Sequence, residues 1–229
     1  DFDSPPYAAS SGVDYAFSPD GRYLAYLRNP DKVEAISTNS DIYLTPISGG
    51  PAKNITEGMR GYDASPTFTP DGRYLLFRSQ ATPGFQADRW RLMRYDVATG
   101  KIEELTRGFD LQVDDIVVTS DSRQIFFTAG ERGRSSVFTV PVEPDLRLRI
   151  ATHVRKVLGG RYVGNLNVSS DGKNLIFASS SNAVPGEVFR ANADGSGAIA
   201  ITSENTASMA SFGLRNAEEV EWAGALNRK

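Results

Sequence analysis

The chain repeats one ten-residue pattern four times at an almost constant interval. The first copy, residues 17–26, reads FSPDGRYLAY, and the second, residues 68–77, reads FTPDGRYLLF. Two more divergent copies, VTSDSRQIFF and VSSDGKNLIF, follow at residues 118–127 and 168–177. The aspartates of the four copies stand at positions 20, 71, 121 and 171, so their separations are 51, 50 and 50 residues. Such a period indicates a repeat architecture, in which each repeat folds as one unit against its neighbours.

Each copy predicts a strand, a tight turn and a second strand. Asp-Gly favours a tight turn because Gly accepts positive φ and Asp can bond its own backbone. Residues 23–27 after the first turn are mostly apolar on both faces, as expected of a strand between two covering sheets. A second hairpin follows in each repeat, although the third repeat is less regular and makes a longer excursion through residues 143–145. Four short strands in about fifty residues match a β-propeller blade.

We therefore predict an all-β fold, a β-propeller of about four four-stranded blades that belong to a larger ring of seven or eight. An all-β sandwich with accidental similarity is the alternative, and four copies in register argue against it. An open arc of four blades would expose apolar surface on its first and last blades. The predicted segments are a connector from upstream at residues 1–12, blades at 13–58, 62–108, 113–158 and 163–204, and strands leading out of the propeller at 205–229. Within that last segment, residues 211–214 and 219–222 are expected to be strands.

Composition excludes several classes of protein. The chain has 229 residues, of which 40% are hydrophobic, enough for a sizeable core. The net charge of −3 gives no electrostatic basis for binding nucleic acid or an anionic membrane, and no stretch approaches the length of a membrane span. The chain has no cysteine, which excludes disulfides and thiolate chemistry and leaves the compartment open.

The longest loops are predicted on one face. In a propeller blade, the loop between strands two and three lies on the same face as the blade-to-blade connections. Residues 28–40 and 79–89 form two such loops in consecutive blades, so we expect them to be neighbours. Binding residues concentrate on long loops held by a rigid scaffold. The second loop combines Gln86, Asp88 and Arg89, a mixture suited to a peptide terminus, although an ion pair that only fixes the loop explains it equally well.

The sequence predicts no catalytic residue and no metal or cofactor site in this chain. A Ser-His-Asp site needs a histidine base, and the one histidine, His153, is expected to be a solvated loop residue. No G-x-S-x-G nucleophile motif is present. The turn aspartates occur once per repeat and are expected to cap turns. We interpret the basic residues 147, 149, 155 and 156 as a solvated strand face, and Tyr23, Tyr74, Phe126 and Phe127 as blade core.

Several motifs resemble known families. The Ser-Pro-Asp-Gly-Arg-Tyr repeats look like TolB-type propeller blades, a weakly specific similarity. More specific motifs resemble the propeller of prolyl-oligopeptidase-family serine peptidases, of the dipeptidyl-peptidase-V and acylaminoacyl-peptidase type. They are STNSDIY at residues 37–43, GYDASP at 61–66, PGFQADR at 83–89 and EVEW at 219–222. This resemblance covers nearly the whole chain.

The resemblance implies a role in peptide hydrolysis. In that family a seven- or eight-bladed propeller precedes an α/β-hydrolase domain with a Ser-Asp-His triad, and the ring limits entry to short peptides. This chain would then be the later part of such a propeller, gating access and helping to bind the amino end of a short peptide. Its partners would be the hydrolase domain and upstream blades of the parent protein, and neither nucleic acid nor a membrane is expected. The expected compartment is the periplasm or the exterior of the cell, with the cytoplasm as the alternative.

The resemblance also suggests substrate-binding residues, which are Gln86, Asp88, Arg89, Asn39 and Asp41. The family often has glutamate where this chain has Gln86, and a neutral amide binds an ammonium less strongly than a carboxylate does. Asp88 would be the remaining acid of that loop. A stand-alone TolB-like module that binds other proteins is the alternative function, and a glycan- or lyase-type propeller enzyme is a third. A G-x-S-x-G motif downstream in the parent gene would favour the peptidase.

Overall fold

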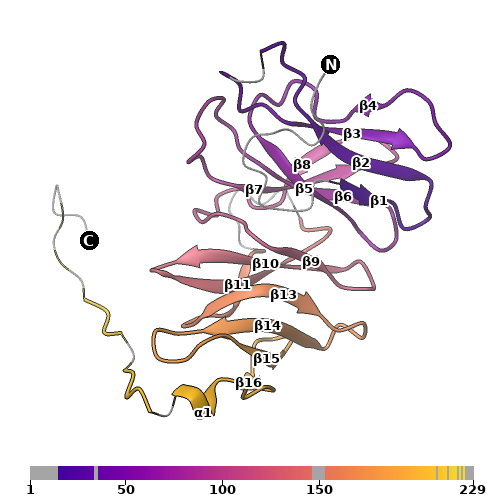
Figure 1. Ribbon diagram of the computed structural model, residues 1–229. Helices are drawn as coiled ribbons and strands as arrows, with labels where there is room; N and C mark the ends of the chain where they lie inside the picture. The colour runs from indigo at the N-terminus through magenta and orange to yellow at the C-terminus, as the bar shows by residue number, and fades with distance from the viewer. Residues whose placement is uncertain are drawn as a thin grey trace.

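The chain folds into four antiparallel sheets, each built from four strands that are consecutive in sequence. The computed structural model describes residues 15–33, 36–145, 153–209, 211–215, 217–220, 222 and 224. Figure 1 shows the sheets following one another from the indigo first sheet to the orange fourth. The prediction of an all-β fold is therefore confirmed. The expected connector at residues 1–12 lies outside the described residues.

The first two sheets have the strand orders β1-β2-β3-β4 and β5-β6-β7-β8. Their strands are β1 (Tyr15–Phe17), β2 (Tyr23–Arg28), β3 (Asp41–Pro46), β4 (Lys53–Asn54), β5 (Asp63–Phe68), β6 (Tyr74–Ser79), β7 (Arg91–Asp96) and β8 (Ile102–Glu104). The third and fourth sheets repeat this order. Their strands are β9 (Ile116–Val118), β10 (Gln124–Glu131), β11 (Arg134–Pro141), β12 (Arg155–Leu158), β13 (Tyr162–Val168), β14 (Asn174–Ser180), β15 (Glu187–Asn192) and β16 (Ile199–Ala200).

The repeated sequence forms the same hydrogen-bonded turn four times. A hydroxyl at position 18, 69, 119 or 169 donates to the aspartate two residues later, at 2.5–2.6 Å. The same hydroxyl accepts the backbone N–H five residues ahead, which begins or precedes the second strand. Each aspartate also accepts the N–H two residues further on. The Ser18 hydroxyl and the Arg22 N–H and side chain lower the pKa of Asp20 to about 2. The expected turn-capping role of these aspartates is confirmed.

The third turn replaces the expected glycine with Ser122. This residue has φ 58°, in the left-handed region that the glycines of the other three turns occupy. Its hydroxyl accepts the backbone N–H of Asp71 at 3.0 Å, so it joins the second turn to the third. Ser120 similarly donates to the carbonyl of Ser170 at 2.5 Å. The second, third and fourth turns are therefore joined to one another by hydrogen bonds.

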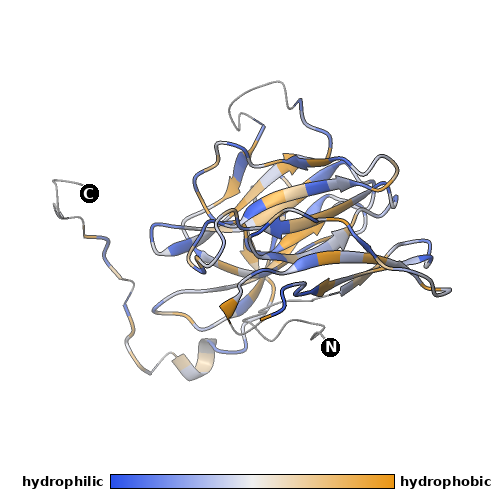
Figure 2. Cartoon of the chain, turned by 90° about the horizontal axis from the view of Figure 1, so that it is seen from above, coloured by the Kyte–Doolittle hydropathy of each residue, from blue (hydrophilic) through white to orange (hydrophobic). Residues whose placement is uncertain are grey.

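The core consists of three apolar layers, one between each pair of adjacent sheets. Strand β6 shows why alternate residues matter, because Leu75 and Phe77 pack toward the first sheet while Tyr74 and Leu76 pack toward the third. All four side chains are at most 5% exposed. Figure 2 shows apolar residues running through the stacked sheets. Both faces of a central strand are thus buried, as its mostly apolar sequence predicts. The expected core residues Tyr74, Phe126 and Phe127 are buried, and Tyr23 packs against the first layer.

The outer sheets carry exposed apolar side chains, as expected for an open arc. Tyr15 and Phe17 of β1 are 57% and 59% exposed, and Ile199 of β16 is 51% exposed.

The segment after β16 differs from the prediction. Residues 206–209 form the short helix α1 (Thr206–Met209), and neither 211–214 nor the described part of 219–222 forms a strand. In Figure 1 the described part of this segment leads away from the fourth sheet. A strand needs an adjacent sheet edge for its N–H and C=O groups, and the described residues of this segment pair with no strand. Phe212 and Trp222 are accordingly 65% and 75% exposed.

Close backbone packing at the junction of the first two sheets gives a test of the fold. A Cβ atom on Gly61 would lie 2.1 Å from the carbonyl oxygen of Gln80, whereas one on Gly130 would meet nothing within 4 Å. We expect Gly61→Ala to lower the free energy of unfolding by about 1–3 kcal/mol or more, because backbone must move. Gly130→Ala is the matched control and should change it by less than about 0.5 kcal/mol. Equal effects in urea unfolding would contradict this packing.

Candidate functional site

Two long loops meet on the face opposite the repeated turns. The first connects β2 to β3 and the second connects β6 to β7. The backbone N–H of Gly84 in the second loop donates to the Thr38 hydroxyl of the first at 2.8 Å. The prediction that these loops are neighbours is therefore confirmed.

A pocket of about 390 Å³ lies between these loops, and we call it the loop pocket. Its walls include Asp31, Thr38, Asn39, Arg60, Pro83 and Gly84. Asp31 is exposed, and one of its carboxylate oxygens accepts the Ser37 hydroxyl at 2.5 Å. The pocket therefore presents an accessible acid, a cation and an amide, which is the chemistry needed to bind a charged peptide end. Asp31 and Arg60 were not predicted, because nothing local in their sequence distinguishes them from solvated loop residues.

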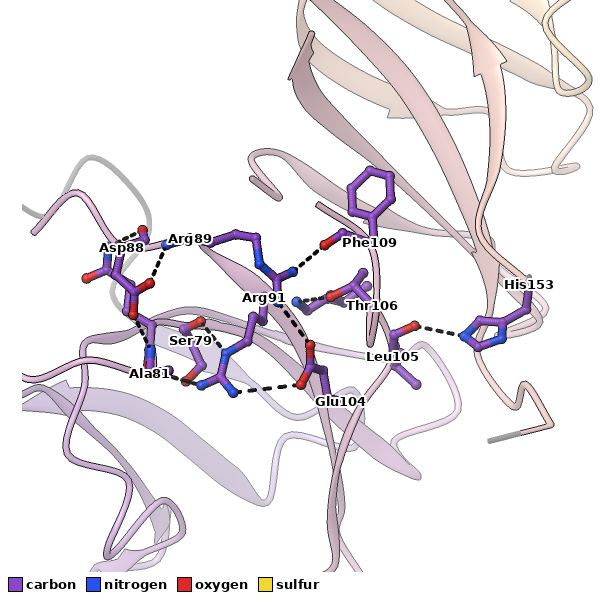
Figure 3. Close-up of polar contacts among 12 residues, drawn as sticks. Ser79, Ala81, Asp88, Arg89, Arg91, Glu104, Leu105, Thr106, Phe109 and His153 are labelled. Atoms are coloured by element: carbon purple, nitrogen blue, oxygen red, sulfur yellow. Dashed lines mark hydrogen bonds and ion pairs between the residues drawn. The ribbon is translucent and has the colours of Figure 1, made fainter. Parts of the chain in front are cut away.

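Asp88 fixes the second loop from inside. Its carboxylate accepts the backbone N–H groups of Ala81, Thr82 and Arg89 at 2.7–2.8 Å, as Figure 3 shows in part. Partial burial raises the pKa of Asp88, but the N–H donors together outweigh it and hold the pKa below its usual range. The carboxylate is thus already engaged by the loop, in agreement with the interpretation of a self-fixing loop.

Gln80 supports the loop from the sheet. This buried side chain, 4% exposed, donates from Nε2 to the carbonyl oxygens of Gln86 and Asp88 at 3.0 and 2.8 Å. The Gln86 side chain itself is exposed and makes no hydrogen bond to the described residues. Gln86 is therefore available to a ligand, on a backbone that Gln80 holds in place.

Arg89 points away from the loop pocket. Its Nη1 donates to the carbonyl oxygen of Phe109 at 2.6 Å, and its Nη2 lies 3.5 Å from the Glu104 carboxylate (Figure 3). Arg91 approaches the other oxygen of Glu104 at 3.7 Å. Arg89 thus connects the second loop to the third sheet's entry segment and does not line the pocket.

The two candidates from the first loop lie in different environments. Asn39 lines the loop pocket, and its Oδ1 is buried without a hydrogen-bond partner among the described residues. Asp41 is 3% exposed and accepts the Asn54 amide at 2.6 Å. Burial raises the pKa of Asp41. The structure therefore brings Asn39 and the second loop together, whereas Asp41 lies inside the first sheet.

A buried acid that the sequence analysis did not single out lies beside Asp41. Asp63 begins β5, is fully buried, and neither of its carboxylate oxygens has a hydrogen-bond partner among the described residues. Burial raises the pKa of Asp63 to about 8; the charge of Asp41 adds to the rise and the charge of Arg91 opposes it. Asp63 is thus a mostly neutral acid at the junction of two sheets near neutral pH.

His153 is not the solvated residue that was expected. Its Nε2 donates to the carbonyl oxygen of Leu105 at 2.9 Å, and the ring is half-buried between the second and third sheets (Figure 3). Within the described ranges, no group of three or more His, Cys, Asp or Glu side chains is placed to hold a metal ion. In the same part of the chain, none of the helices has the length and apolarity to cross a membrane.

Asp63 predicts an unusual dependence of stability on pH. Its pKa is about 8 in the folded state against 3.8 ordinarily, so its stabilising effect is fully present below pH 4 and is lost as pH rises through 8. Stability should fall in this window by up to about 1.4 kcal/mol per pH unit. Asp63→Asn should flatten that slope in urea unfolding between pH 5 and 7.5, while the exposed control Asp110→Asn should keep it. An unchanged slope in Asp63→Asn would contradict a raised pKa.

Asp88 gives a second prediction, about local order. Asp88→Ala removes the acceptor of three backbone N–H groups. Amide hydrogen exchange at Ala81, Thr82 and Arg89 should then accelerate by about tenfold or more, with the sheets unaffected. Asp110→Ala on another exposed loop is the control. If these amides exchange equally fast in wild type and variant, Asp88 does not hold the loop.

Comparison with known proteins places the chain in a family. It is 32% identical over 210 residues to dipeptidyl-peptidase 5 of Porphyromonas gingivalis, covering 88% of this chain and 29% of that protein. It is 33% identical over 230 residues to dipeptidyl-peptidase 5 of Porphyromonas endodontalis, covering 99% of this chain and 32% of that protein. The chain thus spans about a third of the length of these curated relatives. No family model matches the chain.

A solved structure confirms the propeller fold. The β-propeller domain of the Trilobed protease from Pyrococcus furiosus superposes with a TM-score of 0.60 at 11% identity, covering 83% of this chain and 52% of that one. The order of strands, the repeated turns and the sequence relatives agree. The chain is a β-propeller segment of the peptidase family that contains the dipeptidyl-peptidase 5 proteins.

Proposed function

We propose that this chain is the substrate-gating part of a serine exopeptidase that removes dipeptides from the amino ends of short peptides. The observation that carries the proposal is the similarity to dipeptidyl-peptidase 5 along 88% of the chain, within 29% of that relative's length. The chemistry would belong to an α/β-hydrolase domain elsewhere in the parent protein. This chain's share is to bind and orient the substrate and to limit its size.

The loop pocket is the proposed contact with the peptide. Asp31 supplies a carboxylate for the substrate's ammonium group, and Arg60 can pair with an acidic side chain or carbonyl oxygen. Asn39 lines the same pocket, and Gln86 lies exposed on the adjoining loop. Asp31 therefore replaces Asp88 as the acid proposed to bind the amine.

The remaining candidates are proposed to position the site. Asp88 accepts hydrogen bonds from the loop backbone, and Arg89 contacts Phe109 and Glu104. Both residues therefore orient Gln86 without contacting the substrate themselves. Asp41 is buried and supports the start of β3. Displacement of these supports by a small distance would affect a rigid binding site strongly.

The proposed compartment is the periplasm or the exterior of the cell. This proposal rests on analogy with the bacterial dipeptidyl-peptidases alone.

Kinetics of the full-length enzyme test the proposed contacts. Asp31→Asn should raise KM for a dipeptidyl substrate by about tenfold, because an ion pair to the substrate amine is lost, with kcat changed less than about twofold. Asn39→Ala should raise KM by about threefold. Lys173→Ala, in a repeated turn on the opposite face, is the control and should leave both constants unchanged.

Two results would contradict the proposal. Wild-type kinetics in both loop-pocket variants would remove this pocket from substrate binding. Failure of the full-length protein to release dipeptides from any short peptide would remove the proposed function itself.

A further inference from the structure

A second pocket lies where the innermost strands of three sheets converge. Its volume is about 440 Å³, within the range of small-ligand sites, and we call it the axial pocket. It is lined by Ser65 of β5, Arg78 of β6, Asp114 and Asp115 before β9, and Asn165 of β13. Since the first strand of each blade borders the central channel of a propeller, this pocket lies along the channel. None of its lining residues belongs to the loop pocket.

Arg78 brings a half-buried positive charge to the axial pocket. Its Nε and Nη2 both donate to the Ser65 hydroxyl, at 3.2 and 2.9 Å, and its guanidinium lies 4.9 Å from the centre of the Trp90 ring. Within the described ranges, Arg78 forms no ion pair with an acid. Burial lowers the pKa of Arg78 because water is lost around the charge, while the charges of Asp114 and Asp115 oppose this effect. Such a cation would gain a strong, charge-assisted hydrogen bond from an incoming carboxylate.

Asp114 and Asp115 bring two carboxylates to the same pocket, where their charges act on that of Arg78. Their backbone positions are held by Thr128, whose carbonyl and hydroxyl accept the two N–H groups at 2.9 and 3.1 Å. Neither carboxylate accepts a hydrogen bond from the described part of the chain. Both are exposed at the pocket, so they are open to an ammonium group.

The backbone on two sides of the axial pocket is distorted in the same way. Ser65 and Asn165 have φ values of 56° and 52°, in the left-handed region that non-glycine residues rarely adopt. Each lies where the strand register shifts, in β5 and in β13. Bulges and backbone strain of this kind gather at functional sites, where they direct side chains toward a ligand.

We propose that the axial pocket binds a free dipeptide as a zwitterion, with its carboxylate on Arg78 and its ammonium group on Asp114 and Asp115. A dipeptide carries both charges a short distance apart, which matches one cation facing two acids in a pocket of this size. A longer peptide would place only one of its ends there. The inference rests on the proposed function, since a dipeptide is the product that such an exopeptidase would release.

Calorimetry on the full-length enzyme tests this site. The catalytic serine is first blocked with a fluorophosphonate, so that the active site cannot bind product, and Ala-Phe is titrated. We expect binding to persist after the block and to weaken about tenfold or more in Arg78→Gln, because its charged partner is lost. N-acetyl-Ala-Phe and Ala-Phe amide, which each lack one charge, should weaken similarly. Arg22→Gln, in a repeated turn, is the control and should bind as wild type.

Clear outcomes separate this site from the proposed function. Disappearance of binding on blocking the serine, or unchanged binding in Arg78→Gln, would overturn the axial site. Arg78 also contacts Trp90, so Arg78→Gln could fail to fold. In that case the double variant Asp114→Asn with Asp115→Asn tests the site, and this variant should bind Ala-Phe about tenfold more weakly than wild type. Dipeptide release is measured separately on the unblocked enzyme. Release without axial binding refutes the site alone, whereas no release refutes the proposed function.

Discussion

The packing of each sheet face against the next is the interaction on which the rest of this structure depends. A four-stranded sheet with apolar residues on both faces cannot be stable alone, because one uncovered face would leave side chains such as Phe77 or Phe127 in water. Stacked in sequence, the sheets bury these residues completely. Truncation of one such phenylalanine to alanine typically lowers the free energy of unfolding by about 3–5 kcal/mol. These apolar layers therefore supply most of the rigidity of the scaffold that carries the loops.

The repeated turns occupy one face of the stacked sheets, and the long loops that form the loop pocket occupy the other. On one face, the hydroxyl–aspartate turns are short, and Ser120 and Ser122 of the third turn join it to the fourth and the second. On the other face, the side chains of Gln80 and Asp88 form hydrogen bonds with the backbone of the loop between β6 and β7. These bonds hold the loop in one conformation. The result is a pocket whose walls come from two blades and whose shape follows the stacking of the sheets.

Much of the fold could be predicted from the sequence because its signals are local and repeated. The Asp-Gly turns, the apolar strands after them and the adjacency of two loops all follow from a fifty-residue period.

The candidate site residues were harder to assign from the sequence, because the type of a residue does not show which way its side chain points. Asp88 and Arg89 looked like ligands but bond to their own loop and to the next sheet's entry. Asp63 lies in the GYDASP motif, but its burial gave no local signal, because only the stacking of two sheets buries it. The prediction of strands after the fourth sheet was wrong for a related reason. Residues with strand propensity, such as Phe212, form a strand only beside a sheet edge, and a sequence pattern does not show whether such an edge is near.

Centrally, we propose that a rigid propeller limits the parent peptidase to short peptide substrates. The most direct measurement is the rate at which the full-length enzyme releases dipeptides from one sequence presented at increasing length, ending with the same sequence fixed inside a folded protein. The account predicts efficient release from short free peptides, a steep fall with length, and no cleavage within the folded protein. Equal rates across the series, or internal cleavage of the folded protein, would contradict it.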